Sequence, residues 1–133
     1  MTLFLDASAI VAQILQEDDA ALLAAKTAVS PNPVTSPIAV YETVTAIVRA
    51  RQKDVQTAEA IVNAFLLSSN CRVIAIDETM GQQALLAFAR FGKGRHKASL
   101  NMGDCFAYAC AKMLGVPLLC KGNDFIHTDI TIA

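Results

Sequence analysis

The feature that most constrains the fold is the regular alternation of short apolar runs with longer helical segments. The apolar runs have the length and composition of β-strands, and they cover residues 2–5, 34–35, 72–76 and 117–120, with a last one at 130–132. Helical segments separate them at residues 7–16, 18–29, 36–51, 55–68, 77–91 and 102–114. This alternation predicts an α/β fold with a central parallel β-sheet of about four to five short strands flanked by α-helices.

The composition indicates one folded domain. The chain has 133 residues, the usual size of a single domain. It is 54% hydrophobic and 17% charged, which excludes an intrinsically disordered protein. The formal net charge of −1 excludes a strongly basic nucleic-acid coat, although a local basic patch is compatible with it.

We expect a cytoplasmic protein without a membrane anchor. The four cysteines form no CxxC pair and only two histidines are present, so we interpret the cysteines as buried thiols in a reducing cytosol. The same counts argue against a zinc site. No apolar run reaches the roughly 18 residues of a membrane span, and the first residues lack the basic region of a signal peptide.

Four acidic residues, Asp6, Glu42, Asp104 and Asp124, lie in apolar surroundings. Asp6 ends the first strand and Asp124 follows the strand at 117–120, so both are expected at the sheet edge where α/β proteins bind ligands. Glu42 and Asp104 lie on helices that can cover that edge. Each acid also has a local explanation: Asp6 and Asp104 at helix starts, Glu42 on a helix surface and Asp124 in a turn.

Carboxylates that converge in this way repel one another and tend to stay protonated. A divalent cation removes the conflict, and a set of oxygen ligands suits Mg²⁺ or Mn²⁺. The resulting hypothesis is that one or two ions orient a water molecule and stabilise charge on a phosphate during in-line attack. It requires no Ser, Cys or His nucleophile.

A basic stretch, RFGKGRHK, spans residues 90–97 and contains Arg90, Lys93, Arg95 and Lys97. It is either a solvated loop or an arm that contacts the phosphates of a nucleic acid. Arg49, Arg51 and Lys53 add positive charge near the end of the Glu42 helix, where cations also suit the helix dipole.

Three segments together resemble the PIN-domain ribonucleases of the VapC toxin type. They are FLDASAIVAQIL near the N-terminus, AVYE in the middle, and GKGRHKASLNMGDCFAYACAKMLGVPLLCKGNDFIHTDI. The resemblance covers nearly the whole chain and implies a single PIN domain over residues 1–133. It further implies an endoribonuclease dependent on Mg²⁺ or Mn²⁺, acting as the toxin of a toxin–antitoxin module with a VapB-like antitoxin as partner.

By position, the resemblance assigns the metal and the catalysis to Asp6, Glu42, Asp104 and Asp124. Asp129, in HTDI, is close enough in sequence to share the role of the fourth acid. Ser8 matches the small hydroxyl residue that often follows the first Asp. We assign Ser8 to substrate binding together with the four basic residues at positions 90, 93, 95 and 97.

Two helical segments, residues 37–49 and 103–114, are apolar nearly all round, which is typical of helices buried in a core or an interface. With the resemblance, this predicts a homodimer and a groove for an antitoxin segment. Two alternatives remain open at this point. One is a phospho-acceptor signalling domain, for which Lys121 is suggestive, and the other is a DNA nuclease that uses the same metal site.

Overall fold

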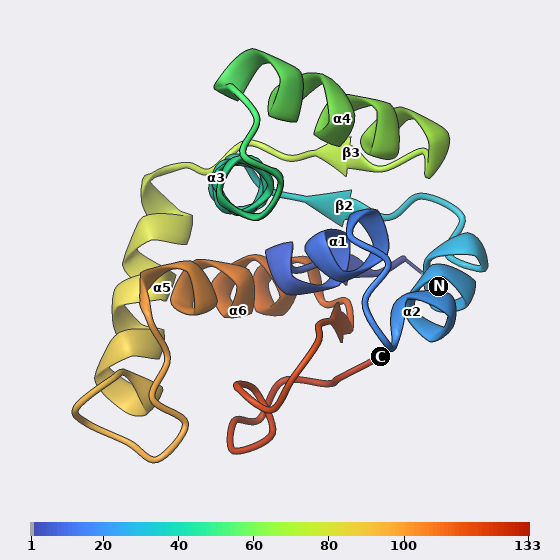
Figure 1. Ribbon diagram of the computed structural model, residues 1–133. Helices are drawn as coiled ribbons and strands as arrows, with labels where there is room; N and C mark the ends of the chain where they lie inside the picture. The colour runs from blue at the N-terminus through green and yellow to red at the C-terminus, as the bar shows by residue number, and fades with distance from the viewer. Residues whose placement is uncertain (1) are drawn as a thin grey trace.

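A computed structural model describes residues 2–133 and shows an α/β fold. The strands are β1 (Phe4–Leu5), β2 (Val34–Thr35), β3 (Arg72–Val73) and β4 (Leu118–Leu119). The helices are α1 (Ala7–Ile14), α2 (Ala20–Ala28), α3 (Pro37–Arg51), α4 (Val55–Ser68), α5 (Glu78–Phe91) and α6 (Met102–Leu114). Figure 1 shows β2 and β3 side by side, and α5 beside α6, with which it makes extensive contact.

The sheet is parallel, with the strand order β3-β2-β1-β4 (Figure 1). Phe4 pairs with Val34 on one side and with Leu118 on the other, so β1 and β4 are adjacent and end together. This confirms the predicted α/β class and brings the residues that follow β1 and β4 to the same edge.

The alternation of side chains along the strands divides the core into two layers. Phe4 and Leu118 pack with Phe91 and Tyr108 and other residues of α5 and α6 on one face of the sheet. Leu5 and Leu119 pack on the other face with apolar side chains of α1 to α4. Because successive residues of a strand point to opposite faces, two-residue strands are enough to anchor both layers.

Hydrogen-bonding caps fix the helix starts. Ser36, Asp54 and Asp77 each accept a hydrogen bond from a backbone N–H in the first turn of α3, α4 and α5. At the other end of α6, Gly115 takes the left-handed conformation (φ 66°) that terminates the helix. These starts and this end agree with the sequence prediction.

Several predicted elements are shorter in the structure. The run at 72–76 is paired only at Arg72–Val73, after which the chain leaves the sheet for α5. The run at 130–132 contributes one isolated bridge, from Ile132 to Leu118. The first helix ends at Ile14 because Gln16 has a positive φ of 56°. Among residues 2–133, no helix is long and apolar enough to cross a membrane.

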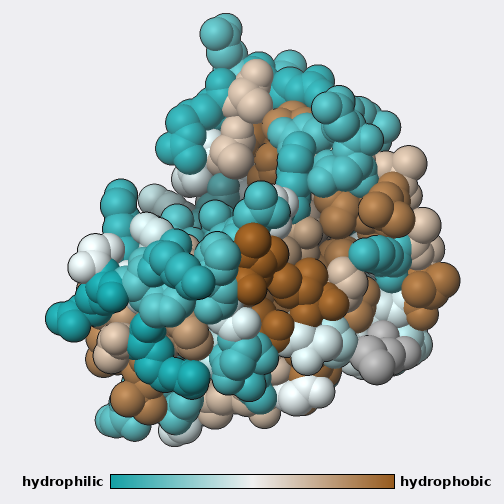
Figure 2. All heavy atoms as spheres, turned by 90° about the horizontal axis from the view of Figure 1, so that it is seen from below, coloured by the Kyte–Doolittle hydropathy of each residue, from teal (hydrophilic) through white to brown (hydrophobic). Residues whose placement is uncertain are grey.

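The two helical segments that are apolar nearly all round differ in the structure. Residues 103–105 and 107–111 of α6 are buried, so this helix lies within the core. In α3, by contrast, Tyr41 is 69% exposed beside Glu42. Figure 2 shows an apolar area in the middle of one face of the molecule, beside a hydrophilic area on its left.

Candidate active site

Asp6 joins the end of β1 to the start of α1. Its side chain is 6% exposed and caps α1: Oδ2 accepts hydrogen bonds from the backbone N–H (3.1 Å) and the hydroxyl (2.5 Å) of Ser8. The Ser8 hydroxyl in turn accepts a hydrogen bond from the backbone N–H of Lys121, just after β4 (3.0 Å). Ser8 therefore ties the ends of the two adjacent strands together and orients the Asp6 carboxylate.

Asp104 lies in the first turn of α6, where it forms a capping box with Asn101. The Asn101 side chain accepts a hydrogen bond from the Asp104 backbone N–H (2.8 Å), and Asp104 Oδ2 accepts one from the Asn101 backbone N–H (3.1 Å). The Asp104 residue is 8% exposed. The local explanations considered for Asp6 and Asp104, as residues of a helix start, are thus correct, and they also fix where both carboxylates point.

Glu42 extends from α3 toward the start of α6. A Cβ atom placed on Gly103 would overlap the Glu42 carboxylate, so the glycine leaves free the space that this carboxylate occupies. This places the Glu42 carboxylate beside the residue that precedes Asp104. Among residues 2–133, no hydrogen bond or salt bridge is made by the carboxylate of Glu42.

The charges of the four acids act on one another. Burial raises the pKa of Glu42 to about 7, with additional repulsion from Asp6 and then Asp104. Burial likewise raises the pKa of Asp104 to about 6, against the opposing Asn101 hydrogen bond and with repulsion from Asp6 and Asp124. The pKa of Asp6 is raised by burial despite the Ser8 hydrogen bonds, and Asp124 adds repulsion. Asp124 itself is exposed.

The donor chemistry fits Mg²⁺ or Mn²⁺ but the side chains do not yet form a ligand set. Among residues 2–133, no three His, Cys, Asp or Glu side chains stand in an arrangement ready to hold a metal ion. The four acids nevertheless offer only oxygen ligands, and none of them forms a salt bridge within that range. An ion bound among them would relieve their repulsion.

Asp129, the other acid considered for the fourth position, has different partners. Its Oδ1 accepts a short hydrogen bond from the Tyr108 hydroxyl. Its Oδ2 lies 3.2 Å from Lys112 Nζ and 3.8 Å from Arg90 Nη1. The Tyr108 hydrogen bond holds the pKa of Asp129 below its usual value, and Lys112 acts in the same direction. This arrangement favours Asp124 over Asp129 as the fourth acid.

The basic stretch is a closed loop rather than an extended arm. The Lys93 N–H donates to the Leu100 carbonyl and the Leu100 N–H donates to the Phe91 carbonyl, both at 2.9 Å. The Arg90 guanidinium lies over the Phe91 ring at 4.7 Å and pairs with Asp129, as described above. Arg95 lies over the ring of Phe88 at 5.3 Å. Lys93 borders an apolar cavity between α5 and α6, and Lys97 is exposed.

A cavity of about 370 Å³ lies beside the acids, between α1 and α3. Its polar lining comes from Ser8, Glu17, Glu42, Thr45, Arg49 and Lys121. Glu42 and Arg49 are seven residues apart on α3, two helical turns and hence about 10 Å along the axis. Arg49 is one of the cations that the sequence places near the end of the Glu42 helix, and the spacing of seven residues puts it on the same face as Glu42.

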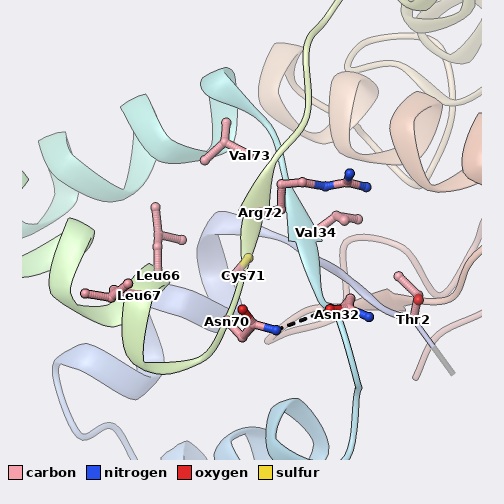
Figure 3. Close-up of a pocket in the computed structure, with 9 residues that line it drawn as sticks. All are labelled: Thr2, Asn32, Val34, Leu66, Leu67, Asn70, Cys71, Arg72 and Val73. Atoms are coloured by element: carbon pink, nitrogen blue, oxygen red, sulfur yellow. Dashed lines mark hydrogen bonds between the residues drawn. The ribbon is translucent and has the colours of Figure 1, made fainter.

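A larger cavity, of about 780 Å³, lies away from the acids, at the beginnings of β2 and β3. Figure 3 shows its lining, where the Asn70 amide donates a hydrogen bond to the Asn32 side chain (3.2 Å). Its lining contains no acidic residue. Ligands of parallel sheets bind at the opposite, carboxyl ends of the strands, so we do not assign the active site here.

Comparisons with known proteins agree with the fold and give related sequences and structures. The PIN domain family model matches residues 3–130. A ribonuclease VapC from Mycolicibacterium smegmatis is 40% identical over 127 residues, which are 95% of each chain. The crystal structure of Mycobacterium tuberculosis VapC20, described as a Sarcin-Ricin loop cleaving toxin, superposes with a TM-score of 0.78, 19% identity and 98% coverage of both chains. A VapBC2 complex from Rickettsia felis, bound to promoter DNA, contains a chain with a TM-score of 0.74 and 14% identity, covering 99% of this chain and 96% of that one.

Proposed function

Because the chain belongs to the PIN-domain family and, within it, to the VapC ribonucleases, we propose that it is the toxin of a toxin–antitoxin module and hydrolyses RNA phosphodiester bonds with Mg²⁺ or Mn²⁺. The observation that carries the proposal is the set of Asp6, Glu42, Asp104 and Asp124. These carboxylates repel one another at the end of β1 and β4 and have no cationic partner in residues 2–133.

The chain's own residues orient two of the proposed ligands and leave room for a third. Ser8 orients Asp6, Asn101 orients Asp104, and Gly103 leaves room for the Glu42 carboxylate. A divalent ion, when bound there, lowers the pKa of a water molecule and stabilises negative charge on the phosphate. Burial raises the pKa of the neighbouring Cys120 thiol to about 12, so this cysteine stays protonated and is unsuited to act as a nucleophile.

The cavity between α1 and α3 supports a path for the RNA backbone. Arg49 lines it about 10 Å from Glu42 along α3, which is a suitable distance for a phosphate near the scissile one. Within residues 2–133 the Arg49 guanidinium forms no salt bridge that would compete with a phosphate. The basic residues of the 90–97 stretch remain a second contact region, with Lys93 and Lys97 the two that do not lie over an aromatic ring.

The experiment that tests the activity is cleavage of single-stranded RNA in Mg²⁺ by Asp6→Asn and Asp104→Asn variants. We expect both rates to fall on the order of 100-fold or more, since each change removes an acid from the proposed metal site. Asp54→Asn, at the exposed cap of α4, is the matched control and should cleave normally. Wild-type rates in both site variants contradict the proposal, and preferential cleavage of single-stranded DNA would indicate a DNA nuclease.

The proposed partners are a VapB-like antitoxin and a second copy of the chain, in the cytoplasm. Apolar side chains left uncovered support protein contacts: on α5, Leu85 is 69% and Leu86 57% exposed, and Met102 at the start of α6 is 66% exposed. Light scattering at micromolar concentration tests the homodimer, and a monomer there contradicts it. Co-purification with the product of a neighbouring small gene tests the antitoxin.

The phospho-acceptor alternative has less support in the geometry. In a phospho-acceptor domain, the lysine near the strand ends would lie beside the acids of the pocket. Here the Lys121 ammonium lies 2.8 Å from Glu17 and 3.5 Å from Asp19, in the turn between α1 and α2. The Lys121 ammonium is therefore paired with two other carboxylates rather than with Asp6.

A further inference from the structure

The segment that carries Asp124 leaves the sheet after β4 and returns to it. At its start, the Lys121 N–H binds the Ser8 hydroxyl. At its end, the Leu118 N–H donates to the Thr131 carbonyl (2.8 Å) and the Ala133 N–H donates to the Leu118 carbonyl (2.9 Å). Figure 1 shows this red segment as a loop that hangs from the sheet edge. Asp124 lies in the part between these two attachments.

Inside the loop, one polar cluster attaches it to the helices. Asp129 accepts a hydrogen bond from Tyr108, which is 6% exposed, and lies 3.2 Å from Lys112 and 3.8 Å from Arg90. The Lys112 ammonium lies 6.0 Å from the centre of the Tyr108 ring. We call Asp129, Tyr108, Lys112 and Arg90 the Asp129 clasp.

We propose that the Asp129 clasp is a positioning device for Asp124, a role that rests on the proposed metal site. Asp104, Tyr108 and Lys112 follow one another at intervals of four residues, so they lie along one face of α6. The same face thus presents Asp104 to the site and Tyr108 and Lys112 to the clasp. Fixing Asp129 to that face holds the loop, and with it Asp124, in register with Asp104.

The position of Asp124 makes such a device necessary. Asp124 is exposed, and within residues 2–133 its side chain makes no hydrogen bond or salt bridge of its own. Its neighbour Phe125 is 1% exposed and anchors the chain in the core, which fixes one side of Asp124. The clasp, four residues beyond Phe125, attaches the remainder of the loop to α5 and α6 through the Tyr108 hydrogen bond and the ion pairs with Lys112 and Arg90.

Tyr108→Phe is the most conservative test, because it removes one hydroxyl and keeps the buried ring. We expect the affinity for Mn²⁺, measured by titration calorimetry on the whole protein, to fall about 5- to 10-fold. Asp129→Asn should lower the Mn²⁺ affinity less than Tyr108→Phe does. It keeps an acceptor for the Tyr108 hydroxyl and loses only two partly exposed ion pairs, which contribute little. Asp54→Ala, which removes the distant cap of α4, should lower the melting temperature without changing Mn²⁺ affinity.

A double-variant cycle separates positioning from general destabilisation. If the clasp acts through Asp124, Tyr108→Phe has no further effect on Mn²⁺ affinity in an Asp124→Asn background. Equal losses in both backgrounds, or unchanged affinity in the single Tyr108→Phe variant, overturn the proposal. Amide exchange of residues 122–127 in the metal-free protein gives a reading that does not depend on a metal. It should quicken in Tyr108→Phe, and unchanged exchange also overturns the proposal.

These outcomes are distinct from failure of the proposed function. Wild-type RNA cleavage by Asp6→Asn and Asp104→Asn would remove the ribonuclease mechanism, whatever the clasp variants do. The opposite result is also possible: those two variants lose cleavage as expected, while Tyr108→Phe keeps the wild-type Mn²⁺ affinity and loop exchange. The ribonuclease mechanism would then stand, and only the clasp would be removed.

Discussion

Replacing Glu42 by glutamine should stabilise the metal-free protein at pH 8 and change its stability little at pH 4.5. The pKa of Glu42 is raised from 4.5 to about 7, first by burial and then by Asp6 and Asp104. A carboxyl whose pKa is higher in the folded state binds its proton more tightly there. Its ionisation therefore opposes folding, and the loss of stability grows from about pH 4.5 and is complete above about pH 7.

The size of the effect follows from the same values. A rise in pKa from 4.5 to about 7 corresponds to about 3 kcal/mol of unfolding free energy at pH 8. Glu42 is only half-buried, and solvent screening reduces this to about 2 kcal/mol. For a domain of this length that is a rise in melting temperature of about 6 °C. At pH 4.5 the same reasoning gives less than about 0.5 kcal/mol.

Thermal unfolding in chelator at both pH values measures the difference. Glu59→Gln, an exposed glutamate on α4, is the matched control and should shift the melting temperature by less than about 2 °C at either pH. If Glu42→Gln melts at or below the wild-type temperature at pH 8, the reasoning about repelling carboxylates is wrong. An equal gain at pH 4.5 and pH 8 would also refute it, because the gain would then be unrelated to ionisation.

Three further results are expected. Mg²⁺ should raise the melting temperature of the wild type at pH 8 and raise that of Asp6→Asn much less; an equal rise would place the ion elsewhere. Arg49→Ala should make the slope of log binding constant against log salt concentration shallower by about 0.7 for single-stranded RNA, which is the contribution of one phosphate. Arg51→Ala should leave that slope unchanged. Equal slopes for the two variants would remove Arg49 from the RNA path. An Arg95→Ala/Lys97→Ala double variant should also bind RNA with a shallower salt dependence, and a wild-type slope would show that this loop does not contact phosphate.

The helices were predictable from the sequence because the signals that start and end them are local. Ser36, Asp54 and Asp77 cap α3, α4 and α5, and the left-handed Gly115 ends α6, all within a few residues of the helix that they bound. Strand lengths were less predictable, because pairing depends on a distant neighbour. The β-branched run at 72–76 is paired only as far as Val73, since β2 ends at Thr35 and offers no further partner.

The proximity of the four acids was predictable because Asp6 and Asp124 follow adjacent strands and because Glu42 and Asp104 lie in apolar helices that cover the same edge. The partners of Asp129 could not be predicted in the same way. Its distinguishing partners, Arg90 and Lys112, lie on two different helices, and no local pattern connects them to HTDI. The closed loop of residues 90–97 could not be predicted from the sequence either. It depends on backbone hydrogen bonds of Leu100 with Phe91 and Lys93.

The structure also separates the roles of the acids. Asp6 and Asp104 each accept backbone hydrogen bonds at a helix start, and those bonds favour the charged form while they fix its direction. Glu42, on α3, has no such compensation: burial and both neighbouring acids all raise its pKa. The fold therefore fixes the direction of the Asp6 and Asp104 carboxylates, whereas within residues 2–133 no hydrogen bond favours ionised Glu42, and a cation would. Binding of an ion should therefore affect stability through Glu42, because it would remove the repulsion that opposes ionisation of this carboxyl.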